Sequence, residues 1–218
     1  MDPAAPFALG PRVAQWVELL PALPLSIDDV LDSRRERRRQ QFEAGRRAAA
    51  RMLNSLGATE AVVGVGPLGS PLWPTGFAGS ITHKHDLLAV AVARTGEASS
   101  IGIDIEAWVS DAVAGDIEQI CLDAQEKALA AVAGVERAWF ATVAFSAKEA
   151  LYKCLFPTVG EFFDFSAARI VRIDAQSGAL HLQLTRSLGS HWARGCVLEG
   201  RFRTNLSHVF SSIELPPK

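Results

Sequence analysis

The chain has 218 residues, of which 49% are apolar and 21% charged, and its formal net charge is −2. It can therefore bury a hydrophobic core in one large domain or in two small domains of about 100 residues each, and it is not a disordered polyelectrolyte. The longest apolar runs, such as residues 87–93, are too short to span a bilayer, and residues 1–9 do not have the pattern of a secretory signal. Three cysteines without metal-ligand spacing predict neither a zinc site nor a disulfide framework, so we expect a soluble cytoplasmic protein.

A long helix is predicted for residues 33–56, because alanine and arginine dominate this stretch, proline is absent, and Gly57 follows as a helix-ending residue. Residues 34–51 contain eight arginines and two glutamates, which gives this segment a charge of +6 in an otherwise acidic chain. Such a local cationic surface favours a partner that carries phosphate over general binding of nucleic acid, for which the whole domain would be basic. A solvated charged face of the helix is the alternative interpretation.

The remaining elements are predicted from the periodicity of the apolar residues and from residues typical of turns. We expect a strand at residues 61–65, a loop rich in glycine and proline at 66–79, and strands at 87–93 and 100–106. Two helices are predicted at 116–133 and 136–155, the second ended by Pro157, and four alternating segments are typical of an antiparallel sheet: 168–173, 180–184, 197–203 and 209–215. Each half thus combines helix with antiparallel strands, which predicts an α+β fold. The first thirty residues show no clear hydrophobic periodicity, and no element is assigned to them.

In residues 101–106 isoleucine occupies every second position. As a strand, this segment directs three isoleucines into the core and places Gly102, Asp104 and Glu106 on the opposite face, where the glycine leaves the backbone open to close approach. Two carboxylates about 7 Å apart on one strand face can converge on a hard cation such as Mg²⁺, which prefers oxygen ligands. An edge strand with solvated acidic residues is the alternative.

A second group of polar residues lies in the predicted helix 136–155. Glu149 and Lys153 are four residues apart and share a face, with Lys148 about a quarter-turn away. Phe145 and Tyr152 would anchor the helix to the core. An ordinary surface ion pair would explain Glu149 and Lys153 equally well.

A third group, Gly-Ser-Ile-Thr-His at residues 79–83, stands at the entrance to a predicted strand. Small hydroxyl residues, a histidine and backbone amides in such a position can bind a phosphate. A lone histidine is more often a turn or surface residue, so this segment by itself indicates little.

In this order and spacing, the three groups resemble the phosphopantetheinyl transferase superfamily, in its larger, surfactin- and enterobactin-synthetase-associated type. That family has a Gly-x-Asp-x-Glu strand, here residues 102–106, and some forty residues later a [Trp/Phe]-Ser-x-Lys-Glu-x-x-x-Lys helix, here residues 145–153. The Trp-Pro pair at 73–74, the Ser-x-Thr-His segment at 80–83 and the basic helix are similar to the branch of enterobactin component D. These motifs lie between residues 34 and 160, and the nine-residue helix motif is highly specific.

The resemblance implies two similar α+β halves related by a pseudo-twofold axis, residues 1–106 and 107–218, with coenzyme A in the cleft between them. It implies Asp104, Glu106 and Glu149 as ligands of Mg²⁺, and Glu149, Lys153 and Asp104 as the catalytic residues. Contacts to the phosphates of coenzyme A would come from Arg38, Arg46, Ser80, Thr82, His83, Lys148 and Lys153.

The implied reaction moves 4′-phosphopantetheine from coenzyme A to a serine of an apo acyl or peptidyl carrier protein and releases 3′,5′-ADP. It needs an in-line nucleophile, neutralisation of the pyrophosphate charge, and a proton acceptor, for which Glu149 is the candidate. Fatty acid, polyketide, nonribosomal peptide and siderophore synthesis all use such carriers, and the sequence does not choose between them. We expect a monomer, because one chain supplies both halves, and neither a nucleic-acid nor a membrane partner.

The chain departs from the family before Trp73, where members commonly carry a basic residue and where this sequence has no lysine or arginine between Arg51 and Lys84. The phosphate contact is therefore either missing or supplied by Lys84 or His85 instead. Two other interpretations stay open: a metal-dependent nuclease or phosphodiesterase that uses the same carboxylates, and a non-catalytic protein that binds carrier domains. The acidic balance of the chain and the helix motif argue against the first, and the presence of all three carboxylates argues against the second.

Overall fold

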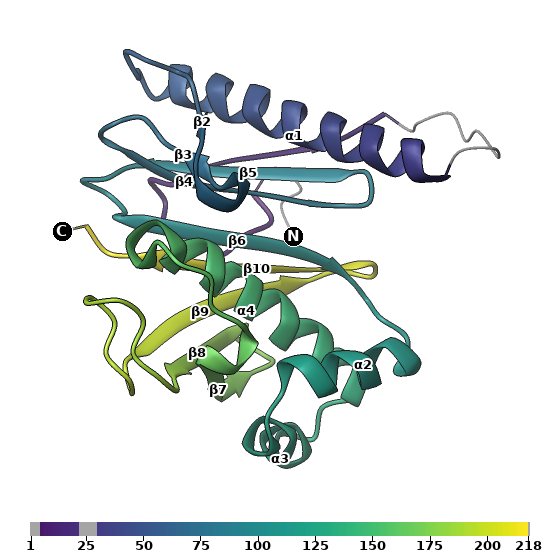
Figure 1. The fold of residues 1–218 in the computed structure, drawn as a ribbon. Helices are drawn as coiled ribbons and strands as arrows, with labels where there is room; N and C mark the ends of the chain where they lie inside the picture. Colours follow the sequence, from purple (N-terminus) through teal and green to yellow (C-terminus); the bar gives the residue numbers. More distant parts are fainter. Residues whose placement is uncertain (1–4, 22–29, 218) are drawn as a thin grey trace.

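The computed structural model describes residues 5–21 and 30–217, with the backbone alone for residues 30–34. The fold is α+β, as the sequence predicts: in the described residues, four helices pack on antiparallel sheets that form two stacked halves (Figure 1). No helix in this part of the chain is long and apolar enough to cross a membrane.

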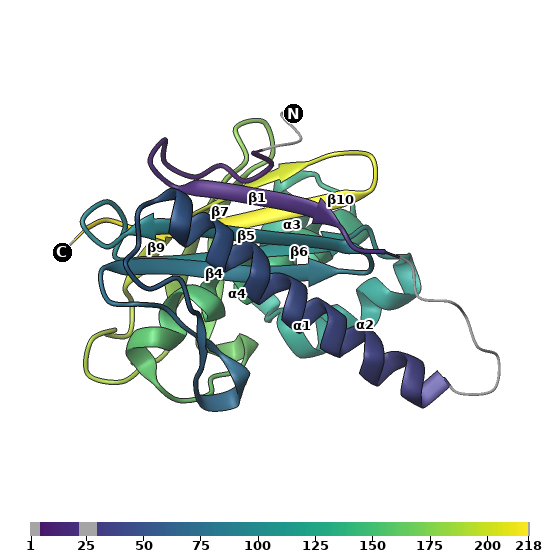
Figure 2. The same ribbon diagram turned by 90° about the horizontal axis from the view of Figure 1, so that it is seen from above.

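The N-terminal half is a three-stranded sheet covered on its outer face by helix α1 (Val30–Ser55) (Figure 2). Its strands lie in the order β1-β5-β4, with the bounds Ala14–Leu19, Leu87–Arg94 and Phe77–Lys84. The helix buries Met52 and Leu53 against Leu88 and Val90 of β5. Strand β1 lies in the segment to which the sequence assigned no element.

Between α1 and β4 the chain forms a small ribbon of two short strands, β2 (Gly64–Val65) and β3 (Pro71–Leu72). The strand predicted at residues 61–65 is therefore reduced to its last two residues. The turn that joins the two strands holds Leu68 at a φ of 55°, in the left-handed region that few side chains adopt, and Leu68 is exposed.

The C-terminal half is a five-stranded sheet in the order β6-β10-β9-β8-β7, with helix α4 (Arg137–Val159) lying across it (Figure 1). In chain order from β6 to β10, the strands are Ser100–Ala107, Ala168–Asp174, Ala179–Leu184, Val197–Thr204 and His208–Leu215. Helix α2 (Asp111–Cys121) packs beside α4, and helix α3 (Ala124–Ala133) packs beside β7.

Two helix boundaries differ from the prediction for physical reasons. The helix predicted at 116–133 is two helices, because Asp123 caps α3: its carboxylate accepts hydrogen bonds from two backbone amides, and Glu126 accepts one from the Asp123 amide. Helix α4 does not end before Pro157. It continues to Val159 and ends at Gly160, whose φ is 74°, so the proline removes one hydrogen bond within the last turns without stopping the helix.

Strand β6 lies between the two halves. Its three isoleucines are fully buried on the side of β5, as the alternation predicts. On the opposite face, α4 lies so close that a Cβ atom on Gly102 would stand 1.9 Å from the carbonyl oxygen of Ala150. Because β6 pairs with β10, hydrogen bonding places β6 in the five-stranded sheet, and residues 95–99 separate it from the three-stranded sheet.

Candidate active site

Asp104 lies at the centre of a charged cluster formed by β4, β6 and α4. Its side chain is 6% exposed, and its Oδ1 accepts hydrogen bonds from Lys153 Nζ at 2.7 Å and from Thr82 Oγ1 at 3.1 Å. Its Oδ2 is buried and has no hydrogen-bond partner among the described residues. A buried carboxylate oxygen without a donor is unfavourable, so this atom marks a position where a cation or a water molecule would be stabilised.

Glu106, two residues further along the same face of β6, forms an ion pair with Lys84 at the end of β4. Burial, together with the nearby charge of Asp104, raises the pKa of Glu106 to about 6, although Lys84 and Lys153 act in the opposite direction. The charged form of this carboxylate is therefore unfavourable among these residues, and a further cation would stabilise it.

Glu149 and Lys153 come to the same cluster from α4. The ammonium group of Lys153 reaches Asp104, Thr82 and the carbonyl oxygen of Ile103, and so links α4 to β4 and β6. Burial raises the pKa of Glu149; the charge of Lys153 opposes this effect and that of Asp104 adds to it. The carboxyl groups of Glu106 and Glu149 thus both lie within electrostatic reach of Asp104.

The hydroxyl residues of β4 bind the neighbouring strand. Ser80 Oγ accepts a hydrogen bond from the amide of Ile103 at 3.1 Å, and Thr82 Oγ1 donates to Asp104. Both side chains are buried, so in this structure they hold β6 in position. Desolvation and the charge of Lys153 lower the pKa of His83, so its imidazole is neutral at pH 7 and can donate one hydrogen bond.

Helix α1 brings two arginines to the outer side of β4. The guanidinium of Arg46 lies 4.7 Å from the ring centroid of Phe42, and its Nε and one terminal nitrogen are buried without hydrogen-bond partners in the described residues. Arg38 is exposed, and its charge contributes to the lowered pKa of His83. Buried N–H groups without acceptors suit an anion, and a phosphate can accept several such hydrogen bonds.

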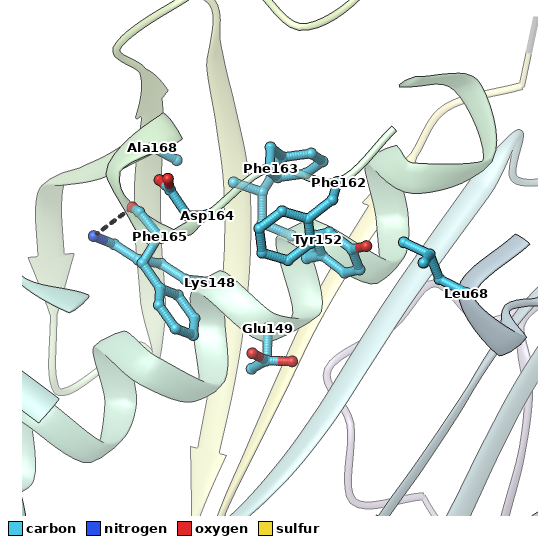
Figure 3. A pocket seen from close by; sticks show the side chains of 10 residues that line it. Leu68, Lys148, Glu149, Tyr152, Phe162, Phe163, Asp164, Phe165 and Ala168 are labelled. Atoms are coloured by element: carbon cyan, nitrogen blue, oxygen red, sulfur yellow. Dashed lines mark hydrogen bonds between the residues drawn. The ribbon is translucent and has the colours of Figure 1, made fainter. Parts of the chain in front are cut away.

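Lys148 lies elsewhere than the sequence led us to expect. Its side chain is 3% exposed, and its ammonium group donates to Glu126 at 2.9 Å, to the carbonyl oxygen of Cys121 at 2.6 Å and to that of Phe165 at 3.3 Å. Figure 3 shows this side chain directed toward the Phe165 backbone, whereas the carboxylate of Glu149 points away from it. All three ammonium protons have protein acceptors, so in this structure Lys148 ties α4 to its neighbours.

Two pockets open beside the cluster. One, of about 470 Å³, lies between the two halves of the fold and is lined by residues 67–73 and β4 on one side and by Lys153 and Phe156 of α4 on the other. The other, of about 380 Å³, lies beside Glu149, and aromatic side chains form its wall (Figure 3): Tyr152, Phe162, Phe163 and Phe165. This wall was not predicted from the sequence, although three phenylalanines within four residues directly after a helix are a detectable signal.

The cluster fits a divalent cation in its chemistry, although its carboxylates do not converge on one point. In the described ranges, no three His, Cys, Asp or Glu side chains are close enough to hold a metal ion together. The carboxylate oxygens are nevertheless ligands that Mg²⁺ prefers, and the buried Oδ2 of Asp104 has a vacant acceptor position. In this structure Lys84 forms an ion pair with Glu106 and Lys153 with Asp104, so both carboxylates of β6 are neutralised.

Two family models match the chain over most of its length. Residues 29–93 match the 4′-phosphopantetheinyl transferase N-terminal domain, and residues 100–207 match the 4′-phosphopantetheinyl transferase superfamily. The unmatched residues 94–99 fall directly before β6, where strand pairing also divides the two sheets. The chain belongs to the 4′-phosphopantetheinyl transferase superfamily.

Individual relatives support the branch that the motifs indicated. The chain is 32% identical over 154 residues to enterobactin synthase component D of Salmonella typhi, which covers 71% of this chain and 63% of the relative. It is 33% identical over 161 residues to the 4′-phosphopantetheinyl transferase Npt of Nocardia iowensis, covering 68% of each chain. It is also 33% identical over 135 residues to the 4′-phosphopantetheinyl transferase PptT of Mycobacterium tuberculosis, covering 62% of this chain and 58% of the relative. The chain thus spans less than two thirds of the length of the Salmonella protein.

Proposed function

We propose that this chain transfers 4′-phosphopantetheine from coenzyme A to a serine of an apo acyl or peptidyl carrier protein and releases 3′,5′-ADP. The observation that carries this proposal is the cluster of Asp104, Glu106, Glu149 and Lys153 in a phosphopantetheinyl transferase fold. Lys153 lines the pocket between the two halves, and Glu149 lines the aromatic pocket beside it.

We assign Asp104, Glu106 and Glu149 to a divalent metal, with Mg²⁺ as the proposed ion. The buried Oδ2 of Asp104 and the raised pKa of Glu106 support this assignment, because both groups are more stable beside a cation. When bound, the ion would neutralise the charge of the coenzyme A pyrophosphate.

The basic residues around the pocket are assigned to the phosphates. Arg46 offers buried N–H groups to the 3′-phosphate, and Arg38 and His83 lie near enough to one another to share in binding it. Lys153 lines the pocket between the halves, where its ammonium group would stabilise the charge that develops on the leaving 3′,5′-ADP.

The transfer itself is a displacement at phosphorus. The serine oxygen of the carrier attacks the β-phosphorus of coenzyme A, the bond from that phosphorus to the bridging oxygen breaks, and 3′,5′-ADP leaves with the oxygen. The hydroxyl proton needs an acceptor, and we assign it to the carboxylate of Glu149, directly or through a water molecule.

Both sides of the pocket come from one chain, so we propose that a monomer forms the complete site. The similarity to enterobactin synthase component D favours a carrier of siderophore or related synthesis as the acceptor. Apo carrier protein incubated with this chain, coenzyme A and Mg²⁺ should gain the mass of one phosphopantetheine, as measured by intact-mass spectrometry. EDTA should abolish the gain; no gain with several types of carrier would contradict the proposed function.

A further inference from the structure

Two lysines neutralise the carboxylates that we assign to the metal. Lys84 Nζ forms an ion pair with Glu106, and Lys153 Nζ lies 2.7 Å from Oδ1 of Asp104. The two carboxylates share one face of β6, whereas the lysines come from different elements, β4 and α4. Each carboxylate of β6 is thus charge-balanced by a lysine of the chain itself.

The two lysines differ in how firmly they are held. Lys153 also has Thr82 Oγ1 at 3.1 Å and the carbonyl oxygen of Ile103 at 3.3 Å as acceptors, which keep it beside Asp104. Lys84 is the last residue of β4, and 31% of its side chain is exposed. Its ion pair therefore lies at the rim of the cluster, on a flexible four-carbon side chain.

A divalent cation and the Lys84 ammonium group compete for the same carboxylate. Mg²⁺ binds oxygen at about 2.1 Å, so an ion on Glu106 would lie within a few ångströms of Lys84 Nζ, where two positive charges repel strongly. The ammonium group must then move to another anion. The chain has no lysine or arginine between Arg51 and Lys84. Lys84 does not line the pocket itself; it ends β4, whose residues 77–81 do, and its partly exposed side chain is free to turn to a phosphate at this end of the strand.

We propose that Lys84 is an exchangeable counter-ion that couples metal binding to coenzyme A binding. In the empty enzyme it holds Glu106 and weakens the metal site; when coenzyme A arrives, its ammonium group moves to a phosphate oxygen and releases Glu106 to the metal. This inference rests on the proposed function. By thermodynamic linkage, coenzyme A then tightens metal binding by the same factor by which the metal tightens coenzyme A binding.

Binding of Mn²⁺, followed by the electron paramagnetic resonance signal of the free ion, tests the inference without catalysis, since Mn²⁺ takes the same oxygen ligands as Mg²⁺. In Lys84→Met, we expect Mn²⁺ to bind the empty enzyme roughly three- to tenfold more tightly than in the wild type, because one competing ion pair is lost. Coenzyme A in the presence of EDTA should bind that variant more weakly, as measured by calorimetry. A lysine that only contacts phosphate would change the second value and not the first.

Two further variants control the experiment. Lys127→Met removes the same charge from an exposed position on α3, away from the cluster, and should change neither affinity. Lys84→Arg keeps the charge and should bind Mn²⁺ as the wild type does. Unchanged or weaker Mn²⁺ binding by empty Lys84→Met would overturn the inference and leave the proposed function intact, as long as the wild type binds both ligands. A wild type that binds neither Mn²⁺ nor coenzyme A would overturn both.

Discussion

Replacing Lys148 with methionine tests whether a buried ion pair holds α4 in place. The side chains of Lys148 and Glu126 are 3% and 1% exposed, and methionine fills a similar volume but leaves the carboxylate without its counter-ion. Removing one partner of a buried ion pair costs about 3–5 kcal/mol. Glu126 keeps two backbone donors, the amides of Asp123 and Ile170, so we expect the free energy of unfolding to fall by a value near the lower limit, about 3 kcal/mol.

Urea unfolding followed by circular dichroism would show this loss as a lower midpoint at an unchanged slope. The double variant Lys148→Met/Glu126→Gln removes both charges and should recover at least about 1 kcal/mol, because residues in direct contact are energetically coupled. The exposed Lys127→Met is the matched control and should change stability by less than about 0.5 kcal/mol. A loss below about 1 kcal/mol for Lys148→Met, or no recovery in the double variant, would refute the reasoning.

Asp104→Asn removes the negative charge that Lys153 and a metal ion would both use. Phosphopantetheine transfer, measured by intact-mass spectrometry, should fall at least about 100-fold while the circular dichroism spectrum stays unchanged. Full activity of the variant would exclude the metal assignment. Gly102→Ala forces a Cβ atom against the α4 backbone and should lower the free energy of unfolding in urea by at least about 2 kcal/mol, whereas a neutral effect would mean that α4 can shift. Because the pKa of Glu106 is raised from 4.5 to about 6, its contribution to stability is full below pH 4.5 and is lost as the pH rises through 6. Glu106→Gln should therefore remove about 1–2 kcal/mol of pH dependence across that window in urea unfolding, and an unchanged profile would contradict the raised pKa.

The residues that carry the site could be predicted from the sequence because their patterns are local. The two-residue period of β6 placed its isoleucines in the core and both carboxylates on the other face, as the structure confirms. The partner of Lys153 could not be predicted in this way. Its ammonium group binds Asp104, 49 residues away in the chain, and no helical or strand period reports which elements meet in space.

The position of Lys148 is a second case in which a local sequence pattern does not report which elements meet in space. Its place on the helix, a quarter-turn from Glu149, was compatible with a phosphate contact. Its actual acceptors include the carbonyl oxygen of Cys121, the last residue of α2, which has no donor within its own helix. Such a carbonyl becomes available only once α2 has ended and packed beside α4, so a pattern within residues 145–153 could not reveal it.

Gly102 explains why the strand motif and the helix motif form one unit. The sequence predicted that this glycine leaves the backbone of β6 open to close approach, and the element that approaches is α4: a Cβ atom there would stand 1.9 Å from the oxygen of Ala150 and 2.7 Å from the nitrogen of Cys154. Glu149 precedes the first of these residues and Lys153 precedes the second. The close contact that requires glycine therefore also sets both functional side chains of α4 beside Asp104, and a larger residue at position 102 would displace them without touching either one.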